Sequence, residues 1–244
     1  MADKPILFSG PMVRALLDGR KTQTRRVFKG AVDGFESCKW SGDGWDVIGN
    51  IAQNNVRALV PPIKPGDRLW VRENVRCGAF TNGKPSEWSP SFYRREQGDT
   101  QNPAGLWYDA DGLRPTNPIG PPSEKSTPSI FMPRWASRVT LIVTDVRVQR
   151  LQNISDPDAI AEGIESTASH FCRGQAYRNY LAAPNKSNDI TWFCPPKASF
   201  RSLWDSLNAD RGFGWDTNPW VVAYTFETIK QNIDQISLCN AGGV

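Results

Sequence analysis

Histidine and closely spaced cysteines are nearly missing from this sequence, and their scarcity argues against two common kinds of site. His170 is the one histidine among 244 residues, and no two of the five cysteines have Cys-x-x-Cys spacing. A structural zinc site needs about four Cys or His ligands, usually paired closely in sequence. A Ser-His-Asp triad needs a histidine beside its nucleophile, and His170 stands alone in a polar segment. We therefore expect reduced thiols, no metal and no cofactor.

Long apolar runs are also missing. Hydrophobic residues make up 39% of the chain, and no stretch approaches the roughly 20 apolar residues of a membrane span. The first residues, Met-Ala-Asp-Lys-Pro, lack the apolar core of a signal peptide. The sequence predicts a cytoplasmic protein that has no membrane partner.

Positive charge is concentrated locally rather than spread over the chain. The net charge is only +4, which is mild for a dedicated nucleic-acid binder. Residues 14–26, however, hold five Lys or Arg against the single carboxylate of Asp18. Such a patch is sufficient for one nucleotide or a short strand. Some of the ten tryptophans are available to stack on a base.

Periodicity predicts several strands and few helices. Alternating apolar residues predict strands over residues 5–8, 67–75, 137–151 and 220–226. Helical spacing and capping signals predict short helices over residues 12–17, 155–162 and 199–208. The alternation of apolar residues shifts by one position at Thr144-Asp145, which predicts a bulge, or two strands meeting at a corner. No helical pattern separates 67–75 from 137–151, which argues against a parallel α/β sheet. We expect an α+β fold built around a small mixed barrel.

One carboxylate lies on an apolar strand face. Glu73 alternates in phase with Leu69, Val71 and Val75. If that face is the inside, Glu73 is a buried carboxylate that needs a partner. We consider two roles for it: a catalytic acid, or an ion-pair partner of Arg25 or Arg26.

The segment from Gly19 to Arg26 carries four cations and two hydroxyls in eight residues. Gly19 is placed to end the preceding helix in the left-handed conformation, so we expect a loop. Lys, Arg and Thr together suit a phosphate or a polarised carbonyl. The alternative is a solvated basic loop.

The same segment resembles a known signature. Gly19, Lys21, Thr24 and Arg26 match the Gly-x-Lys-x-x-(Glu or Thr)-x-Arg pattern of the ASCH domain family. Five further stretches resemble phage- and prophage-encoded members, in family order: 5–11, 65–73, 132–138, 159–164 and 212–220. The resemblance implies a PUA-like β-barrel with rim helices around a nucleoside-sized cleft.

The resemblance also implies catalytic roles. Small bacterial ASCH-type enzymes that deacetylate 4-acetylcytidine use a Lys, a Thr and a Glu. Matching motifs assigns these roles to Lys21 as base, Thr24 as nucleophile and Glu162 as acid. The match at Glu162 rests on the pattern Ala-Ile-x-Glu-Gly, and Glu73 competes for the acid role.

Additional segments distinguish this chain from those small enzymes, which are less than half its length. We expect one domain over residues 1–229 with insertions at about 30–60, 78–134 and 166–197, followed by a tail at 230–244. Trp107 and Tyr108 precede a turn-forming sequence. We expect Trp107 to border the cleft and stack on the base; the alternative is that both rings anchor the insertion.

These observations leave three functions open. The first is an amidohydrolase that acts on an N-acylated cytidine-like base, with Arg20, Arg25, Arg26, Glu73 and Trp107 binding the substrate. The second is a non-catalytic reader of RNA or modified bases, and the third is a ribonuclease. The expected partner is a nucleoside or single-stranded RNA. The acyl group and the oligomeric state stay open.

Overall fold

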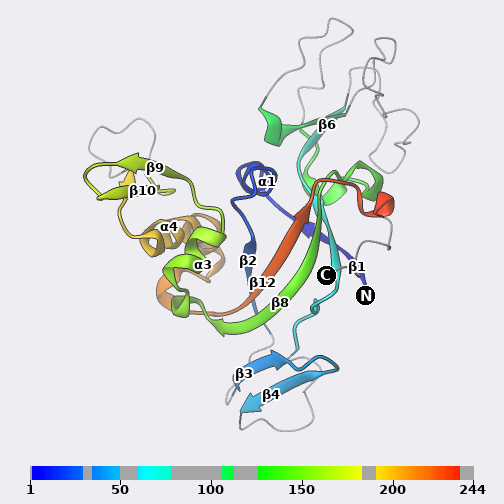
Figure 1. The fold of residues 1–244 in the computed structure, drawn as a ribbon, viewed down its shortest axis with the longest axis horizontal. Coiled ribbons are helices and arrows are strands. Elements are labelled where there is room, and N and C mark those ends of the chain that lie inside the picture. Colours follow the sequence, from blue (N-terminus) through cyan, green and yellow to red (C-terminus); the bar gives the residue numbers. More distant parts are fainter. Residues whose placement is uncertain are drawn as a thin grey trace, which may run out of the picture. The chain divides into compact units, whose positions relative to one another are not determined.

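The computed structural model describes residues 2–29, 35–49, 60–77, 106–112, 126–182 and 191–236. Within these ranges the fold is mixed α+β, with mostly strands and a few short helices (Figure 1). Contacts divide the chain into two compact units. Unit 1 comprises Met1–Leu17, Asp67–Ile142 and Thr228–Val244. Unit 2 comprises Asp18–Gly66 and Val143–Glu227.

The strands of unit 1 flank β5 (Arg68–Arg72). On one side β1 (Asp3–Leu7) runs parallel to β5, and on the other the start of β8 (Thr140–Arg150) runs antiparallel to it. A separate hairpin pairs β6 (Val75–Cys77) with β7 (Leu106–Tyr108). Helix α1 (Gly10–Leu17) packs against the short 3-10 helix η3 (Asp109–Asp111).

In unit 2, β2 (Gln23–Val27) runs antiparallel to β12 (Trp220–Ile229). The hairpin of β3 (Phe35–Trp40) and β4 (Trp45–Gly49) joins β8 through Lys39 and Arg147. A second sheet has the order β11 (Trp192–Phe193), β10 (Gly174–Arg178), β9 (Ser166–Ser169). Helix α3 (Asp156–Ala161) packs on α4 (Pro196–Asn208).

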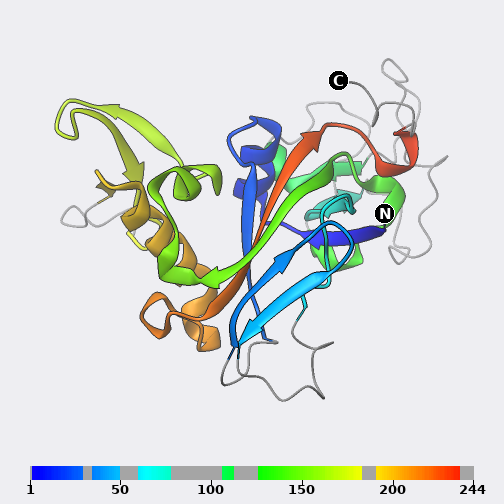
Figure 2. The ribbon, with the colours of Figure 1, turned by 60° about the horizontal axis from the view of Figure 1, so that its bottom comes forward.

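The main sheet has seven strands, and its central path is β1-β5-β8-β12-β2. Both β8 and β12 continue from one unit into the other, and they run side by side in Figures 1 and 2. Among the described residues this path does not return on itself, so these strands form no closed barrel. No helix in the described ranges is long and apolar enough to cross a membrane. The remaining 3-10 helices are η4 (Ser129–Phe131), η5 (Arg134–Ala136), η6 (Leu151–Asn153), η7 (Ala209–Arg211), η8 (Trp215–Thr217) and η9 (Ile233–Gln235).

Local patterns predicted seven of these elements. The strands and helices expected from periodicity correspond to β1, β5, β8, β12, α1, α3 and α4. The face with Leu69, Val71, Glu73 and Val75 is buried, as the alternation predicted. The strand β8 is continuous, so the alternative of two strands meeting at Thr144-Asp145 is wrong. Both residues are exposed where the alternation shifts, and the alternative of a bulge stays a prediction.

Two expectations about short segments are also wrong. Residues 23–27 are not a loop but the strand β2, which starts only four residues after Gly19. The thiols of Cys172 and Cys194 are not reduced but form a disulfide. Their sequence separation of 22 residues has no motif spacing, and the pairing of β10 with β11 brings them together. Cys38 is a buried free thiol, and burial raises its pKa to about 11.

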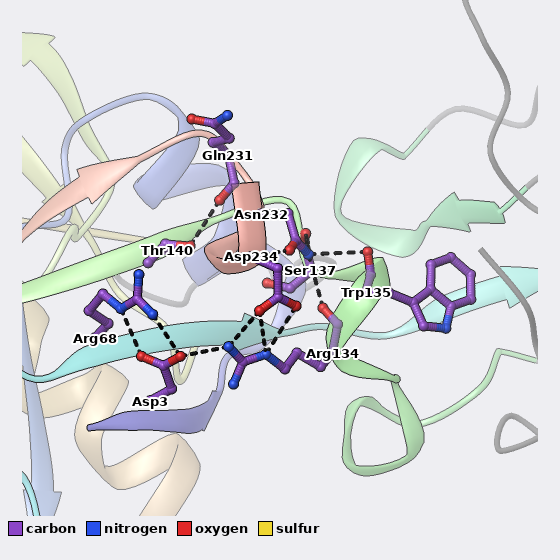
Figure 3. A network of polar contacts seen from close by, with 9 residues as sticks. All are labelled: Asp3, Arg68, Arg134, Trp135, Ser137, Thr140, Gln231, Asn232 and Asp234. Carbon is purple, nitrogen blue, oxygen red and sulfur yellow. Dashed lines mark hydrogen bonds and ion pairs between the residues drawn. The ribbon is translucent and has the colours of Figure 1, made fainter. Parts of the chain in front are cut away.

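The expected insertions and tail lie partly within the described ranges. The first insertion contains the β3–β4 hairpin, and the third contains the β9–β10–β11 sheet. Most of 78–134 lies outside the described residues. In the expected tail, Ile233 is 1% exposed. The side-chain amide of Asn232 donates to the carbonyls of Arg134, Trp135 and Ser137 at 3.0, 3.1 and 2.7 Å (Figure 3).

Candidate functional site

The candidate site lies where the chain after α1 meets the chain after α3. Gly19 adopts a φ of 74°, which ends α1 and directs the next residues toward β2. Lys21 then forms a β-bridge with Glu162, and the amide of Thr22 donates to the carbonyl of Ala161 at 2.9 Å. Backbone pairing therefore places Lys21 beside Glu162, although 141 residues separate them.

The side chains of this bridge form a buried ion pair. Lys21 Nζ donates to Glu162 Oε2 and to the Glu162 carbonyl oxygen, each at 2.8 Å. Arg25 Nη1 donates to the other carboxylate oxygen, Oε1, at 2.9 Å. Lys21 is 2% exposed and Glu162 is 4% exposed. The Glu162 carboxylate is thus held between two cations in a place that water hardly reaches.

A second carboxylate extends this network. Asp158, on α3, accepts from Arg25 Nη2 at 2.9 Å and from Gln23 Nε2 at 3.0 Å. Arg147 of β8 approaches the same carboxylate at 3.4 Å. The buried Arg25 Nε donates to no acceptor within the described part of the chain. Removing so many charges from water is costly unless each is paired, and this network pairs nearly all of them.

Burial governs the electrostatics of Lys21. Desolvation lowers the pKa of its ammonium group, and the charge of Glu162 opposes that shift. Arg26 and Arg25 lower the pKa further because like charges disfavour the protonated form. The net effect is a lowered pKa. The environment therefore favours a neutral amine at Lys21 more than water does, and a neutral amine can accept a proton.

Thr24 lies on a different face of β2. Lys21, Gln23 and Arg25 all direct their side chains to Glu162 or Asp158. Because side chains alternate along a strand, Thr24 points to the opposite face, opposite Tyr224 of β12. It is 2% exposed. The structure therefore brings Lys21 to Glu162 directly but separates Thr24 from both by the strand itself.

The other predicted cations of this segment are exposed. Arg20 pairs with Asp18, and its Nη1 donates to the carbonyl of Gly163 at 3.0 Å. Arg26 is exposed on the same face of β2 as Thr24. These two cations flank Lys21 and Arg25 in sequence, and Arg20 is engaged by Asp18 and Gly163.

Glu73 and Trp107, which belong to unit 1, have partners of their own. Glu73 is 1% exposed and accepts from Arg138 Nε and Nη2 at 2.8 and 3.0 Å. It needs a partner, as predicted, but the expectation of Arg25 or Arg26 is wrong, because Arg138 binds both oxygens of the Glu73 carboxylate. Burial raises the pKa of Glu73, and Arg138 opposes this shift. Trp107 is half-buried on β7, opposite Arg76.

Tyr108 has an anchoring role. Its hydroxyl donates to the carbonyl of Ala136 at 2.8 Å, and the Arg138 guanidinium lies 3.9 Å from its ring centre. This matches the anchoring alternative for Tyr108. The expected stacking role of Trp107 stays a prediction.

Three members of the buried network were missed at the sequence level: Gln23, Arg147 and Asp158. Asp158 had a usable signal, because it precedes Glu162 by four residues, and such residues share one helix face. Gln23 precedes Arg25 by two, the strand period. Arg147 had no signal in the sequence, because its contact with Asp158 depends on how β8 and α3 are placed relative to each other.

A separate cavity of about 650 Å³ lies in unit 2. Its lining includes Tyr180, Asp205, Gly212, Trp215 and Asp216, and it contains neither Lys21, Thr24 nor Glu162. Asp205 and Asp216 are already engaged there by the amide of Trp215 and by Arg201.

Comparisons of the chain with protein-family models, with curated proteins and with solved structures found no match. The Lys21–Glu162 pair and the motif resemblance are therefore the features that bear on function.

Proposed function

We propose that this protein is an amidohydrolase that removes an acyl group from a cytidine-like base, as 4-acetylcytidine would require. The proposal includes an ASCH-type, PUA-like domain, which the ordered motifs support. The observation that carries it is the 2.8 Å contact between Lys21 Nζ and the Glu162 carboxylate, both buried. Perturbed titratable groups of this kind are common at catalytic sites.

The pair supplies an acid and a base after one internal proton transfer. When the Lys21 ammonium gives its proton to Glu162, the pair becomes a neutral amine and a carboxylic acid. Burial lowers the pKa of Lys21 and so eases the loss of this proton, whereas the charge of Glu162 opposes it. Arg25 holds the other carboxylate oxygen, so Glu162 Oε2 stays directed at Lys21.

The reaction then balances as follows. A nucleophile oxygen forms a bond to the acyl carbon while its proton passes to Lys21. The carbon–nitrogen bond breaks while Glu162 gives its proton to the leaving exocyclic nitrogen. A proton returning from Lys21 to Glu162 restores the pair.

The proposal has two alternatives for the nucleophile: Thr24, which the motif resemblance implies, and a water molecule. In this structure Thr24 points to the face of β2 opposite the pair, so its proton has no direct path to Lys21. If Thr24 attacks, an acyl ester forms on its hydroxyl, and water then hydrolyses that ester through the same pair. If water attacks directly, Thr24 has only a packing role on the opposite face of β2. A positioned acid or base typically raises the reaction rate by about 10²–10⁴-fold. The variants below should therefore change the rate measurably with either nucleophile.

The test is incubation of the pure protein with 4-acetylcytidine, followed by chromatographic separation of cytidine and acetate. We expect Lys21→Met and Glu162→Gln to lower kcat by about 100-fold or more. Lys230→Met, which removes an exposed lysine, serves as the control. Thr24→Val should be as damaging as Lys21→Met only if Thr24 is the nucleophile. Absence of cytidine with the wild type, or normal turnover by Lys21→Met, would contradict the proposal.

A non-catalytic reader of RNA or modified bases is the second candidate. The observation that favours it is the exposure of large aromatic side chains in unit 2, with Phe171 at 97% and Trp192 at 40%. A reader would bind the nucleoside or RNA and leave it unchanged in the same chromatographic assay.

A further inference from the structure

The turn between β9 and β10 exposes a large apolar ring. Phe171 is 97% exposed, more than any other large hydrophobic side chain in the described ranges. Burial of an apolar side chain is favourable, and the fold forgoes that gain here. Figure 2 shows this turn at the outer end of unit 2, away from β2 and β12.

The turn is held by a disulfide and by local hydrogen bonds. Cys172, next to Phe171, is joined by the disulfide to Cys194, which directly follows β11. The amide of Cys172 donates to Ser169 Oγ, and the amide of Arg173 donates to the carbonyl of His170, both at 3.3 Å. A ring presented on a preorganised turn loses little conformational entropy when it binds.

Cations and a second aromatic ring accompany Phe171. Trp192 on β11 is 40% exposed and lies opposite Arg178 of β10. The Arg178 guanidinium lies 5.3 Å from the centre of the Tyr180 ring. Arg178 also pairs with Glu165 at 2.8 Å, and the side chain of Arg173 is exposed in the turn. The turn therefore combines exposed aromatic rings with an exposed guanidinium, which is the combination that binds single strands.

The same sheet is joined directly to the candidate site. β9 begins four residues after Glu162. The amide of Glu165 donates to the Tyr180 hydroxyl at 2.8 Å, and the amide of Arg178 donates to the carbonyl of Glu165 at 2.9 Å. A nucleic-acid strand bound at the turn and following β9 and β10 would approach the segment that carries Glu162.

We propose that the β9–β10 turn binds single-stranded nucleic acid, with the Phe171 ring stacked on a base and Arg173 beside a phosphate. This site goes beyond the proposed hydrolysis, because it adds affinity for a polymer and needs no catalysis. A lipid surface fits less well. The strand leading to the turn is Ser166-Thr167-Ala168-Ser169, polar in three of four positions, whereas membrane insertion requires a broader apolar face.

The experiment is fluorescence anisotropy of labelled oligouridylate and oligodeoxythymidylate with the full chain. Loss of one stacking ring should weaken binding about tenfold in Phe171→Ala, and Phe171→Trp should restore it. Arg173→Gln should reduce the salt dependence of binding by about one phosphate contact. The matched control is Leu207→Ala, which removes an apolar side chain that is 51% exposed on α4. The two oligonucleotides distinguish RNA from DNA as the natural strand.

Several outcomes would overturn the proposal. One is equal affinity of Phe171→Ala and the wild type, and another is an equal loss in Leu207→Ala. A third is Phe171-dependent binding to phosphatidylserine vesicles with no binding of either oligonucleotide. A protein that binds oligonucleotide but does not deacylate 4-acetylcytidine contradicts the proposed hydrolysis and not this site. A protein that deacylates the nucleoside but binds no oligonucleotide contradicts this site alone.

Discussion

At the scale of single residues, the burial of Lys21 has the largest consequence. A lysine in a solvated loop would tolerate substitution with a change below about 0.5 kcal/mol in the free energy of unfolding. Lys21 is instead almost fully buried and shares the Glu162 carboxylate with Arg25. Removing one member of a buried ion pair leaves the other charge poorly compensated.

A double-mutant cycle tests this coupling. We expect Lys21→Met to lower the free energy of unfolding by about 3 kcal/mol, near the low end for buried pairs because Arg25 remains. Glu162→Gln in the same chain should recover part of the loss, with a coupling energy of about 1 kcal/mol or more. Urea denaturation of the four proteins measures it. Strictly additive effects would show that the two side chains do not interact.

At the scale of elements, α3 positions the two carboxylates of the network. Ser155 caps this helix through its hydroxyl, which accepts from the amide of Asp158 at 3.2 Å. At the other end, Gly163 has a φ of 82°, a conformation that glycine adopts without strain. The helix has only six residues, so its ends contribute much of what keeps Asp158 and Glu162 on one face.

The cap is testable by itself. Ser155→Ala should lower the free energy of unfolding by about 1 kcal/mol, since the Asp158 amide loses its acceptor. Ser155→Asp keeps an acceptor and should retain the stability, so it is the matched control. Denaturant titration distinguishes the two, and equal stability of all three proteins would contradict the capping role.

At the scale of the whole molecule, unit 1 is assembled from both ends of the chain and a middle segment. Arg134 joins two of these segments to its own, because it pairs with Asp3 near the N-terminus and with Asp234 near the C-terminus (Figure 3). Asn232 adds three hydrogen bonds to the chain around η5. Contacts between distant segments of this kind hold a discontinuous unit together.

Asn232 should therefore contribute strongly to stability. In Asn232→Ala three carbonyls lose their donor in a mostly buried place, and we expect a loss of about 2 kcal/mol in the free energy of unfolding. Gln231→Ala is the control, because its exposed side chain donates to the carbonyl of Gln235 at 3.2 Å, while its backbone carbonyl still accepts from Thr140. It should change stability by less than about 0.5 kcal/mol. Thermal or urea unfolding that ranks the two variants equally would contradict this role.

The Asp3 ion pairs predict a pH dependence. The Arg68 guanidinium, and then Arg134, hold the pKa of Asp3 below its usual value, although partial burial opposes them. The unfolded chain therefore binds this proton more tightly, so the contribution of Asp3 is present above about pH 4 and is lost as the pH falls further. The stability difference between the wild type and Asp3→Asn should be larger at about pH 7 than at about pH 3. A difference independent of pH would exclude this linkage.

The sequence by itself determined the local features, because they depend on residues close together in the chain. Alternation predicted β5 and the burial of Glu73, and capping signals predicted α3 from Ser155 to Gly163. The motif around Lys21 identified the segment that forms the candidate site. Each of these patterns depends on hydrogen bonds between nearby residues, or on the regular spacing of apolar and polar side chains over a short stretch.

Only the tertiary structure decided which distant groups meet. Lys21 and Arg25 are buried because β2 faces α3, and Glu73 pairs with Arg138 because β5 lies beside the start of β8. Cys172 reaches Cys194 through the pairing of β10 with β11. A charged side chain has the same local preferences whether it ends in water or against a carboxylate, so its environment depends on the long-range packing of the strands, which no local pattern records.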